Sequence, residues 1–465
     1  MTSTYGVTMT TAPPLLMRDA LVRMVGIEGY RRLLTAMYRP ELLHAAGASA
    51  EFIRQLERLL RSQDVESMPR QEALLDSDSK SRVYVVQTVF DNGSYWTWVL
   101  KWYNGARQQQ APIESRMNAY FLQRLAPSRT VVPVLDVVPL SNVAETALSV
   151  ALMPYCGELT LYDRLHQLPR HDPRVESLLE QASNTLAYTQ VLGRMGHEEH
   201  TIALTSLTPD EAPAYFLEQI DSALLRPFAA SGNPLEMGGA LLKHFGFFAR
   251  VLGDDSSRDG LYYRGINPRN IMLVGNQQAE IDFEQDSLRS RFIDIVSLLE
   301  NGLEMTEWDD AADYPAYTGQ TAFDTWEQQR QRAQAALSRY NYLSHPRIER
   351  LTAAFIDTTW QLEQQHLQGK RAPYQPAAYR LILETARLFR HLQYVGYCKR
   401  NEMQTRNPSK RVSSHYRQKF HALWAKVALD HLIFPPCAAA QCLPEPERQP
   451  AMALRHTLDR LPLMS

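Results

Sequence analysis

The segment 82–103 constrains the fold of this chain more than any other part of the sequence. It contains two runs rich in β-branched and aromatic residues, RVYVVQTVF (82–90) and YWTWVLKWY (95–103), on either side of Asp-Asn-Gly-Ser. An Asn-Gly pair between two such runs predicts a β-hairpin, because both residues accept the left-handed backbone that tight hairpin turns require. The chain must therefore contain at least one antiparallel pair of strands.

The neighbouring segments extend this hairpin into a small sheet. A first strand is expected near 72–75, a helix at 112–125, and two further apolar strands at 131–138 and 147–156. From Leu159 onward the pattern is mostly helical and continues to about Leu432, with long helices predicted at 175–192 and 241–252. The sequence thus predicts an α+β chain in which a small antiparallel sheet precedes a large helical part.

Four regions follow from this pattern. Residues 1–68 are expected to form a helical extension with no evident chemistry, serving as a packing element or a docking surface. The sheet-rich part occupies 69–155 and the helical part 156–435, with a polar, Pro-containing insertion at about 196–234. The last segment, 436–465, contains Pro435-Pro436 on its border and LPEPERQP within it, and is expected to be a loosely ordered tail.

Charge and hydropathy exclude several classes of protein. The chain has 465 residues with 49 basic and 51 acidic side chains and no long run of one sign, which argues against a nucleic-acid binder and a polybasic membrane anchor. No apolar run reaches the length that spans a bilayer. The N-terminal residues lack a basic start followed by an apolar core, so no secretory signal is predicted and a cytoplasmic location is the default.

The four cysteines, Cys156, Cys398, Cys437 and Cys442, are scattered. Cys437 and Cys442 have no second pair or His cluster beside them, so free thiols in a reducing compartment are expected rather than a zinc site.

One lysine stands out because of its surroundings. Lys101 lies inside the apolar run WVLKWY, where a charge is costly unless it is paired or faces a cleft. The predicted helix that follows offers Glu114 as its partner. The alternative is an edge-strand lysine whose ammonium reaches water.

Two later blocks carry oxygen ligands, LYYRGINPRNIML (261–273) and AEIDFEQ (279–285). Asn270 and Asp282 are expected on adjacent strands with side chains converging at one end, a hard-oxygen pair suited to magnesium. The alternative for each residue alone is a turn or cap position. Asp294, at the start of the amphipathic segment FIDIVSLL, is expected to cap or brace the first block.

These blocks resemble those of the aminoglycoside phosphotransferase and choline kinase branch of the protein-kinase-like superfamily. That branch carries H-G-D-x-x-P-x-N-I-L, then I-D-(F/W)-(E/G), then D-(L/I)-A. This chain has YRGINPRNIM at 263–272, IDFE at 281–284 and DIV at 294–296. The likeness extends over roughly Gln71 to Leu432, and the short segment after the metal motif also resembles bacterial lipopolysaccharide core kinases.

The resemblance implies a bilobal protein-kinase-like fold that binds ATP and Mg²⁺. By this likeness Lys101, paired with Glu114, holds the phosphates, while Asn270 and Asp282 hold magnesium. The insertion at about 196–234 matches a helical insertion of the family. Two further sites are expected at the nucleotide: a phosphate contact from Ser79, Lys80 and Ser81, and an adenine-binding hinge from Met153, Tyr155 and Cys156 that is otherwise an ordinary strand-to-helix connection.

The departures from the family pattern bear on catalysis. The catalytic aspartate falls on Gly265, the preceding histidine on Tyr263, and the glycine-rich loop on DSDSKS. Gly265 cannot act as a base. Substitutes are sought among the carboxylates nearby, which are otherwise expected to lie in a solvated turn (GDDSSRDG) or beside the metal motif: Asp254, Asp255, Asp259 and Glu284.

Three outcomes stay open. The chain is read as a Mg-ATP-binding phosphotransferase for a small molecule with atypical catalysis, as a pseudokinase that regulates a protein partner, or as an enzyme of another transfer such as AMPylation. A scaffold that binds neither nucleotide nor metal is a duller alternative. Four carboxylates could line a pocket for a cationic acceptor, although surface positions are the expectation: Asp210, Glu211, Asp309 and Asp310.

Overall fold

The structure of the chain is a computed structural model that describes most of its residues. The described residues are 17–62, 70–76, 82–89, 95–125, 131–141, 147–157, 159–168, 172–232, 238–275, 277–283, 285–308, 346–367, 376–405, 408–434 and 438–459. The chain divides into two compact units. The sheet unit is Met1–Glu158 with Leu273–Gln285, and the helical unit is Leu159–Met272 with Asp286–Ser465.

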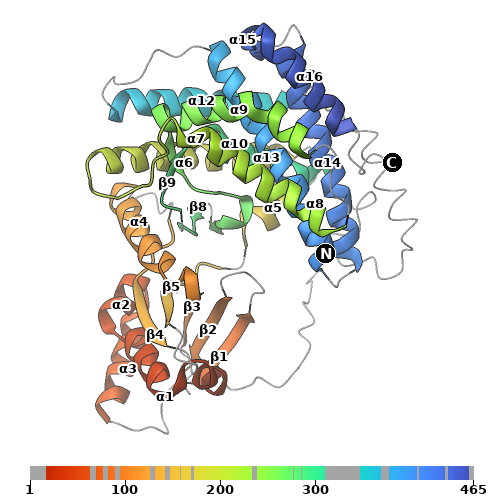
Figure 1. Cartoon of the computed structure of the whole chain (residues 1–465). Coiled ribbons are helices and arrows are strands. Elements are labelled where there is room, and N and C mark those ends of the chain that lie inside the picture. Colours follow the sequence, from red (N-terminus) through yellow and green to blue (C-terminus); the bar gives the residue numbers. More distant parts are fainter. Residues whose placement is uncertain are drawn as a thin grey trace. The chain divides into compact units, whose positions relative to one another are not determined.

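The sheet unit is built around five antiparallel strands in the order β1-β2-β3-β5-β4 (Figure 1). The expected hairpin is confirmed, since β2 and β3 pair in continuous register from Arg82 opposite Trp102 to Val89 opposite Tyr95. The elements are α1 (Met17–Met37), α2 (Pro40–Ala46), α3 (Ala50–Ser62), β1 (Arg70–Asp76), β2 (Arg82–Val89), β3 (Tyr95–Asn104), η1 (Gly105–Arg107), α4 (Gln110–Leu125), β4 (Asp136–Ser141) and β5 (Ala147–Pro154).

The two faces of this sheet differ, because side chains point alternately to one face and the other along each strand. Side chains two residues apart share a face, and Trp98, Leu100 and Trp102 of β3 are all buried in one core cluster with the helices α1–α3. Lys101 therefore points to the opposite face. The N-terminal helices are part of the hydrophobic core of the sheet unit, with Leu33 and Leu56 fully buried there.

The helical unit contains long helices around a second core. Its elements are α5 (Leu161–Gln167), α6 (Pro173–Glu198), α7 (Glu211–Ile220), the π-helical turn η2 (Asp221–Leu225), α8 (Arg226–Ala230), α9 (Gly238–Asp259), β6 (Leu261–Tyr263), η3 (Pro268–Asn270), β9 (Ser287–Arg289), α10 (Phe292–Trp308), α12 (Pro346–His366), α13 (Pro376–Gln404), α14 (Pro408–Ile433), α15 (Ala438–Cys442) and α16 (Glu445–Asp459). β6 pairs with β9, and β7 (Ile271–Val274) pairs with β8 (Gln277–Glu280).

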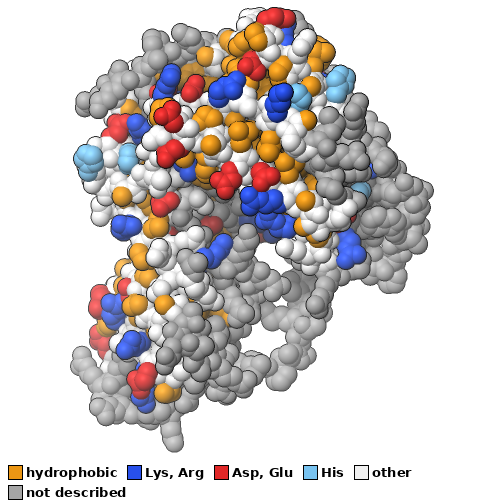
Figure 2. All heavy atoms as spheres, in the orientation of Figure 1, with side chains coloured by type: hydrophobic (Ala, Val, Ile, Leu, Met, Phe, Trp, Pro, Cys, Tyr) orange, Lys and Arg blue, Asp and Glu red, His pale blue; other side chains and the backbone are white. Residues whose placement is uncertain are grey.

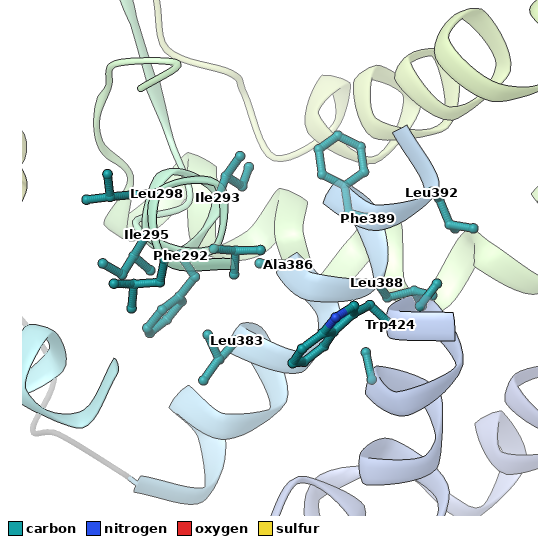
Figure 3. Packing of buried hydrophobic residues seen from close by; sticks show 14 of the residues in the cluster. Phe292, Ile293, Ile295, Leu298, Leu383, Ala386, Leu388, Phe389, Leu392 and Trp424 are labelled. Atoms are coloured by element: carbon teal, nitrogen blue, oxygen red, sulfur yellow. The ribbon is translucent and has the colours of Figure 1, made fainter. Parts of the chain in front are cut away.

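Helices α10 and α13 form the centre of this second core. In Figure 3, Phe292 of α10 lies near Leu383 and Ala386 of α13, and these three residues belong to one buried cluster with Ile295 and Leu298 of α10. Their spacing of three or four residues places them on one face of each helix. The expected α+β fold class, a small antiparallel sheet with a large helical part, is confirmed.

Two expectations about order were wrong. The segment 438–459 is not a loosely ordered tail, because α16 buries Ala451, Leu454 and Leu458 in the core of the helical unit. The stretch GDDSSRDG is not a solvated turn, because α9 continues through it to Asp259 and buries Asp255. Both segments are polar or contain proline, but their apolar residues have the helical spacing that allows one face to pack.

The described surface is mixed in charge. Figure 2 shows acidic and basic side chains interspersed on the described part of the face in view, in keeping with the near-zero net charge. Among the described residues, no helix combines the length and apolarity that a membrane crossing requires.

Candidate functional site

Lys101 is the centre of a buried ionic site in the sheet unit. Its ammonium donates to Glu114 Oε2 at 2.9 Å and to Asp282 Oδ1 at 2.6 Å. The lysine is only 8% exposed and Glu114 is fully buried. Taking such charges out of water costs several kcal/mol per ion, so the pairing must be close and well formed for both to stay charged. The expected Lys101–Glu114 pair is present, and the edge-strand alternative for Lys101 is wrong.

Helix α4 supports this site with side chains on one face. Glu114, Asn118 and Phe121 are four and three residues apart, which places them in a row along the helix. Asn118 donates to the Val132 carbonyl at 2.6 Å and accepts from the Val134 amide at 2.8 Å. The Val132 amide in turn donates to the Glu280 carbonyl at 2.9 Å. Glu280 lies two residues before Asp282, so α4 is connected to the segment that carries Asp282.

Asp282 is fixed by the residue that follows it. Phe283 is fully buried and its ring lies 5.2 Å from that of Phe121, centroid to centroid. Asp282 itself has φ 72°, a left-handed backbone conformation that costs a non-glycine residue of order 1 kcal/mol or more and that persists where surrounding contacts impose it. Its side chain keeps 35% of its surface exposed. A strained, partly exposed carboxylate beside a buried lysine is typical of a functional site.

The expectation that Asp282 sits inside a strand was wrong. β8 ends at Glu280, and Asp282 lies in the loop after it. The apolar pattern of Ile281-Asp282-Phe283 reflects the packing of Phe283 against α4 rather than a strand ladder. Asn270 is also not on a strand but ends the 3₁₀ turn η3, directly before β7.

The loop that contains Gly265 belongs to the helical unit and is held by Asp294. This carboxylate is fully buried and accepts from the Arg264 amide at 2.6 Å and the Ile266 amide at 3.2 Å. Its predicted role as a brace is confirmed. Gly265, between the two bound amides, has φ 63°, so its lack of a Cβ serves the turn as well as removing the carboxylate.

Local capping gives this loop its shape. Asn267 accepts the Arg269 amide at 2.8 Å as the N-cap of η3, and the Asn270 amide donates to the Asn267 carbonyl at 2.9 Å. The Arg269 guanidinium lies 3.8 Å from the ring centroid of Tyr162, a cation–π contact that anchors the turn to α5. Asn270 is half-buried within this frame.

Burial dominates the electrostatics around the loop. It raises the pKa of Asp294, against the opposing effects of the Arg264 amide and of the charges of Arg390 and Arg264. It also raises the pKa of the Tyr263 hydroxyl further above neutrality. Tyr263 stands where the family pattern has a histidine, and it supplies no group that titrates near neutrality.

The sheet unit thus brings together Lys101, Glu114 and Asp282 from distant parts of the sequence. Met153 lies opposite Val99 in the register of β5 and β3 and so shares the face of Lys101, with Tyr155 and Cys156 half-buried beyond the strand end. Asn270 belongs to the other unit, and its convergence with Asp282 stays a prediction.

The remaining candidate residues fall into three groups. Ser79, Lys80, Ser81, Glu284, Asp309 and Asp310 lie outside the described residues. Asp210 and Glu211 are exposed at the start of α7, where Glu211 accepts from the Thr208 hydroxyl at 2.7 Å, a capping role that fits the surface expectation. Asp254 and Asp259 lie on α9, and Asp255 lies close to Arg291.

Sequence reasoning missed Asn118, Phe121 and Phe283. The signal was present as the spacing of Glu114, Asn118 and Phe121 on one helical face, but an apolar or amide residue on a helix is ordinarily core. Among the described residues, no cluster of three or more His, Cys, Asp or Glu side chains is arranged to hold a metal ion. In the part of the chain that the structure describes, Cys156, Cys398 and Cys442 are not joined by a disulfide bond.

Comparisons with known proteins give no family assignment. No protein-family model matches the chain. No curated protein matches it significantly either.

Solved structures give distant likenesses. A spectinomycin phosphotransferase in complex with ADP and spectinomycin is 9% identical with a TM-score of 0.35, over 83% of this chain and 93% of that one. A choline kinase from Cryptosporidium parvum is 10% identical with a TM-score of 0.45, over 80% and 94% of the two chains. A Plasmodium vivax ethanolamine kinase is 10% identical with a TM-score of 0.39, over 80% and 89%. At TM-scores below one half, these likenesses carry no weight for fold or activity.

Proposed function

We propose that this chain is a kinase-fold, Mg-ATP-binding protein of the small-molecule phosphotransferase type with atypical catalysis. The observation that carries the proposal is the Lys101 ammonium held between Glu114 at 2.9 Å and Asp282 at 2.6 Å. A structural core has no need of this arrangement, because apolar side chains of similar volume would be at least as stable. A cation on the phosphates and a carboxylate on magnesium are what phosphoryl transfer requires.

The side chains of Lys101, Glu114, Asn270 and Asp282 fit both ATP phosphates and magnesium. Asp282 offers a partly exposed carboxylate, the ligand that Mg²⁺ prefers together with phosphate oxygens. Asn270 would supply an amide oxygen as the second protein ligand. Lys101 would hold the α- and β-phosphates, and Glu114 would keep the ammonium aimed at them. Bound magnesium would neutralise charge on the phosphates.

Gly265 decides what kind of catalysis this site supports. Where the resembled family carries its proton-accepting aspartate, this chain has Gly265, and the left-handed backbone there suits glycine. Because the transition state of phosphoryl transfer is largely dissociative, the missing base slows the reaction rather than preventing it. The same observation favours two alternatives, a nucleotide-binding pseudokinase that regulates a protein partner and an enzyme that transfers an adenylyl group.

Thermal unfolding with ATP and magnesium tests the nucleotide site. A ligand that binds only the native state stabilises it by about 2.7 kcal/mol at a hundredfold excess over Kd. We expect a rise in Tm that is larger with magnesium than with ATP alone, that Asp282→Ala abolishes, and that substitution of the exposed Glu41 on α2 leaves intact. No rise at millimolar Mg-ATP would contradict the proposal. Transfer of label from α- or γ-labelled ATP then distinguishes adenylyl from phosphoryl transfer.

A further inference from the structure

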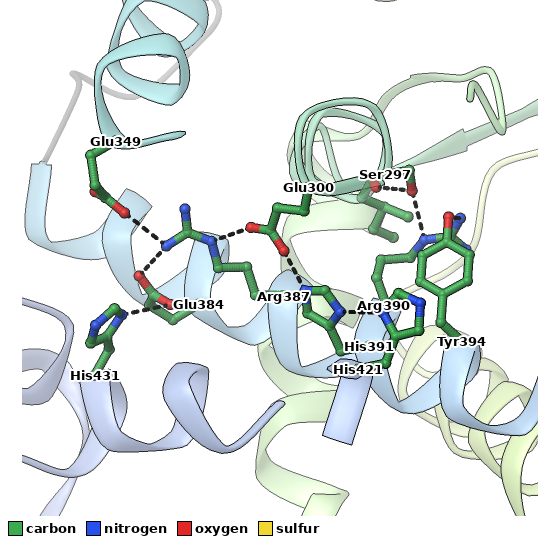
Figure 4. A network of polar contacts seen from close by, with 11 residues as sticks. Ser297, Glu300, Glu349, Glu384, Arg387, Arg390, His391, Tyr394, His421 and His431 are labelled. Carbon is green, nitrogen blue, oxygen red and sulfur yellow. Dashed lines mark hydrogen bonds and ion pairs between the residues drawn. The ribbon is translucent and has the colours of Figure 1, made fainter. Parts of the chain in front are cut away.

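Two histidines meet in the core of the helical unit, one from α13 and one from α14 (Figure 4). His391 Nδ1 lies 3.0 Å from His421 Nδ1, and both residues are at most 1% exposed. Neither ring belongs to the ionic site around Lys101. A close contact between two buried imidazole nitrogens therefore needs a physical explanation of its own.

Glu300 of α10 determines which nitrogen of His391 carries a hydrogen. Its carboxylate contacts His391 Nε2 and also accepts from Arg387 Nε at 2.7 Å. Because an ionised carboxylate only accepts, we assign a hydrogen to His391 Nε2. A neutral His391 then has a bare Nδ1, which accepts from His421 Nδ1, whereas a cationic His391 donates to a bare His421 Nδ1. In both cases one proton lies between the two Nδ1 atoms.

The contact leaves no room for a second proton between the rings. If His391 and His421 were both cationic, two N–H groups would point at each other across 3.0 Å, and two like charges would lie together in a buried place. The closed pair can therefore carry at most one positive charge. Where the contact is open, each ring meets water and gains its own charge at about pH 6.5.

Aromatic packing keeps the two rings in this position. His391 stacks on Trp424 of α14 with ring centroids 5.7 Å apart, and His421 stacks on Tyr394 of α13 with centroids 4.8 Å apart. Each helix thus supplies one histidine and the aromatic ring that covers the other histidine. A second charge on the pair must separate α13 from α14 in this region, because neither ring can turn away without losing its stacking partner.

We propose that His391 and His421 form a pH-sensitive lock between α13 and α14, which is closed while the pair carries at most one charge and opens when both rings are protonated. The lock does not depend on nucleotide binding. Its direction agrees with the electrostatics, since burial and then the charges of neighbouring residues lower the pKa of His421 well below that of an ordinary histidine. Such a group stabilises the closed form above about pH 6.5, and this stabilisation is lost as the pH falls.

The other charged groups around the pair do not titrate in this range. Those that surround it come from all three helices: Glu300 of α10, Arg387, Arg390 and Tyr394 of α13, and Arg417 of α14. Two more carboxylates of α13 contact α14, Glu384 and Glu402. Burial raises the pKa of each, but their hydrogen-bonded and cationic neighbours lower it overall to about 2, so they lose their charge only below pH 4.5. Mild acid therefore isolates the histidines.

Amide hydrogen exchange of the whole chain across pH tests the lock without any ligand. The protection of α14 amides around His421 and of α6 amides is measured after correction for the intrinsic effect of pH. His421→Phe is the comparison, because it keeps a ring against Tyr394 and removes the titrating nitrogen. Between pH 7.5 and 5.5 we expect α14 protection to fall about tenfold more in wild type than in His421→Phe, since only the open form gains the extra proton. The α6 amides should show no such excess.

His431→Gln is the matched control on the same helix. Burial lowers the pKa of His431, but Glu384, 3.2 Å away, raises it overall, so His431 favours the closed form in acid and cannot cause the loss. This variant should keep the full excess. If His421→Phe does not fold, His421→Asn replaces it, because its amide still bonds to a ring nitrogen but does not titrate. Parallel profiles in wild type and the His421 variant, an equal excess in α6, or loss of the excess in His431→Gln would overturn the proposal.

Discussion

Replacing Glu114 with leucine should destabilise the chain, because it leaves Lys101 in a buried position with a single counterion. Glu114 is fully buried, and its Oε2 lies 2.9 Å from the Lys101 ammonium. Removing one partner of a buried pair costs about 3–5 kcal/mol. Lys101 retains Asp282 at 2.6 Å, so we expect the lower end of this range, about 3 kcal/mol.

The double variant Lys101→Met/Glu114→Leu gives the sharper prediction. It removes both buried charges and replaces them with apolar side chains of similar length, an exchange that is often neutral or mildly stabilising. We expect the double variant to be more stable than Glu114→Leu alone, with a coupling energy of about 2 kcal/mol between the two substitutions.

Urea unfolding at pH 7 is the assay, followed by tryptophan fluorescence, to which the buried Trp98 and Trp102 beside the site contribute. Glu41→Leu, at an exposed position of α2, is the control and should change the free energy of unfolding by less than about 0.5 kcal/mol. If the losses of the two single variants simply add in the double variant, the ionic site described here does not exist as a coupled unit.

Three further predictions concern the supporting structure. Burial raises the pKa of Glu384, but Arg387 and its other cationic neighbours lower this pKa to about 2 (Figure 4). The ionised Glu384 therefore contributes about 3 kcal/mol to the free energy of unfolding above pH 4.5, and this contribution is lost as the pH falls toward 2. The difference in unfolding free energy between wild type and Glu384→Gln should shrink over this pH range, and a constant difference would contradict the prediction. Leu33→Ala should cost about 2–5 kcal/mol in urea unfolding, because Leu33 is fully buried between the N-terminal helices and the sheet, whereas a near-zero cost would mean that these helices are dispensable. Gly396→Ala should lower Tm, because its Cβ would overlap the Ala223 carbonyl of η2, and an unchanged Tm would refute this close approach of α13.

Local sequence signals predicted the sheet unit well. The Asn-Gly pair and the β-branched and aromatic residues on either side of it predicted β2 and β3 within about one residue, because both signals depend on neighbours along the chain. Lys101 was identified because a charge inside an apolar strand needs an explanation, and Glu114 because the helix that follows offers it as a partner. Asp294 was recognised from its position before an amphipathic helix.

The contacts that the sequence did not reveal are those between distant segments. Nothing in the chain around Asp282 shows that it leaves the strand, since this depends on Phe283 packing against Phe121, far away in sequence. The burial of Ser297 and Glu300 on α10 could not be predicted for the same reason. It depends on hydrogen bonds from Arg390 and Arg387, which are far away in sequence. The segment 436–465 was predicted to be loosely ordered because of its prolines and polar residues, although Leu454 and Leu458 have helical spacing.

Isothermal titration of Mg-ATP into wild type and Asp282→Asn tests the central claim most directly. The substitution keeps the size of the side chain and removes the charge that would hold magnesium and that now pairs with Lys101. The account predicts saturable binding to wild type that weakens at least tenfold in Asp282→Asn and is unchanged in Glu41→Gln. Equal binding to all three proteins, or binding to none, would contradict it.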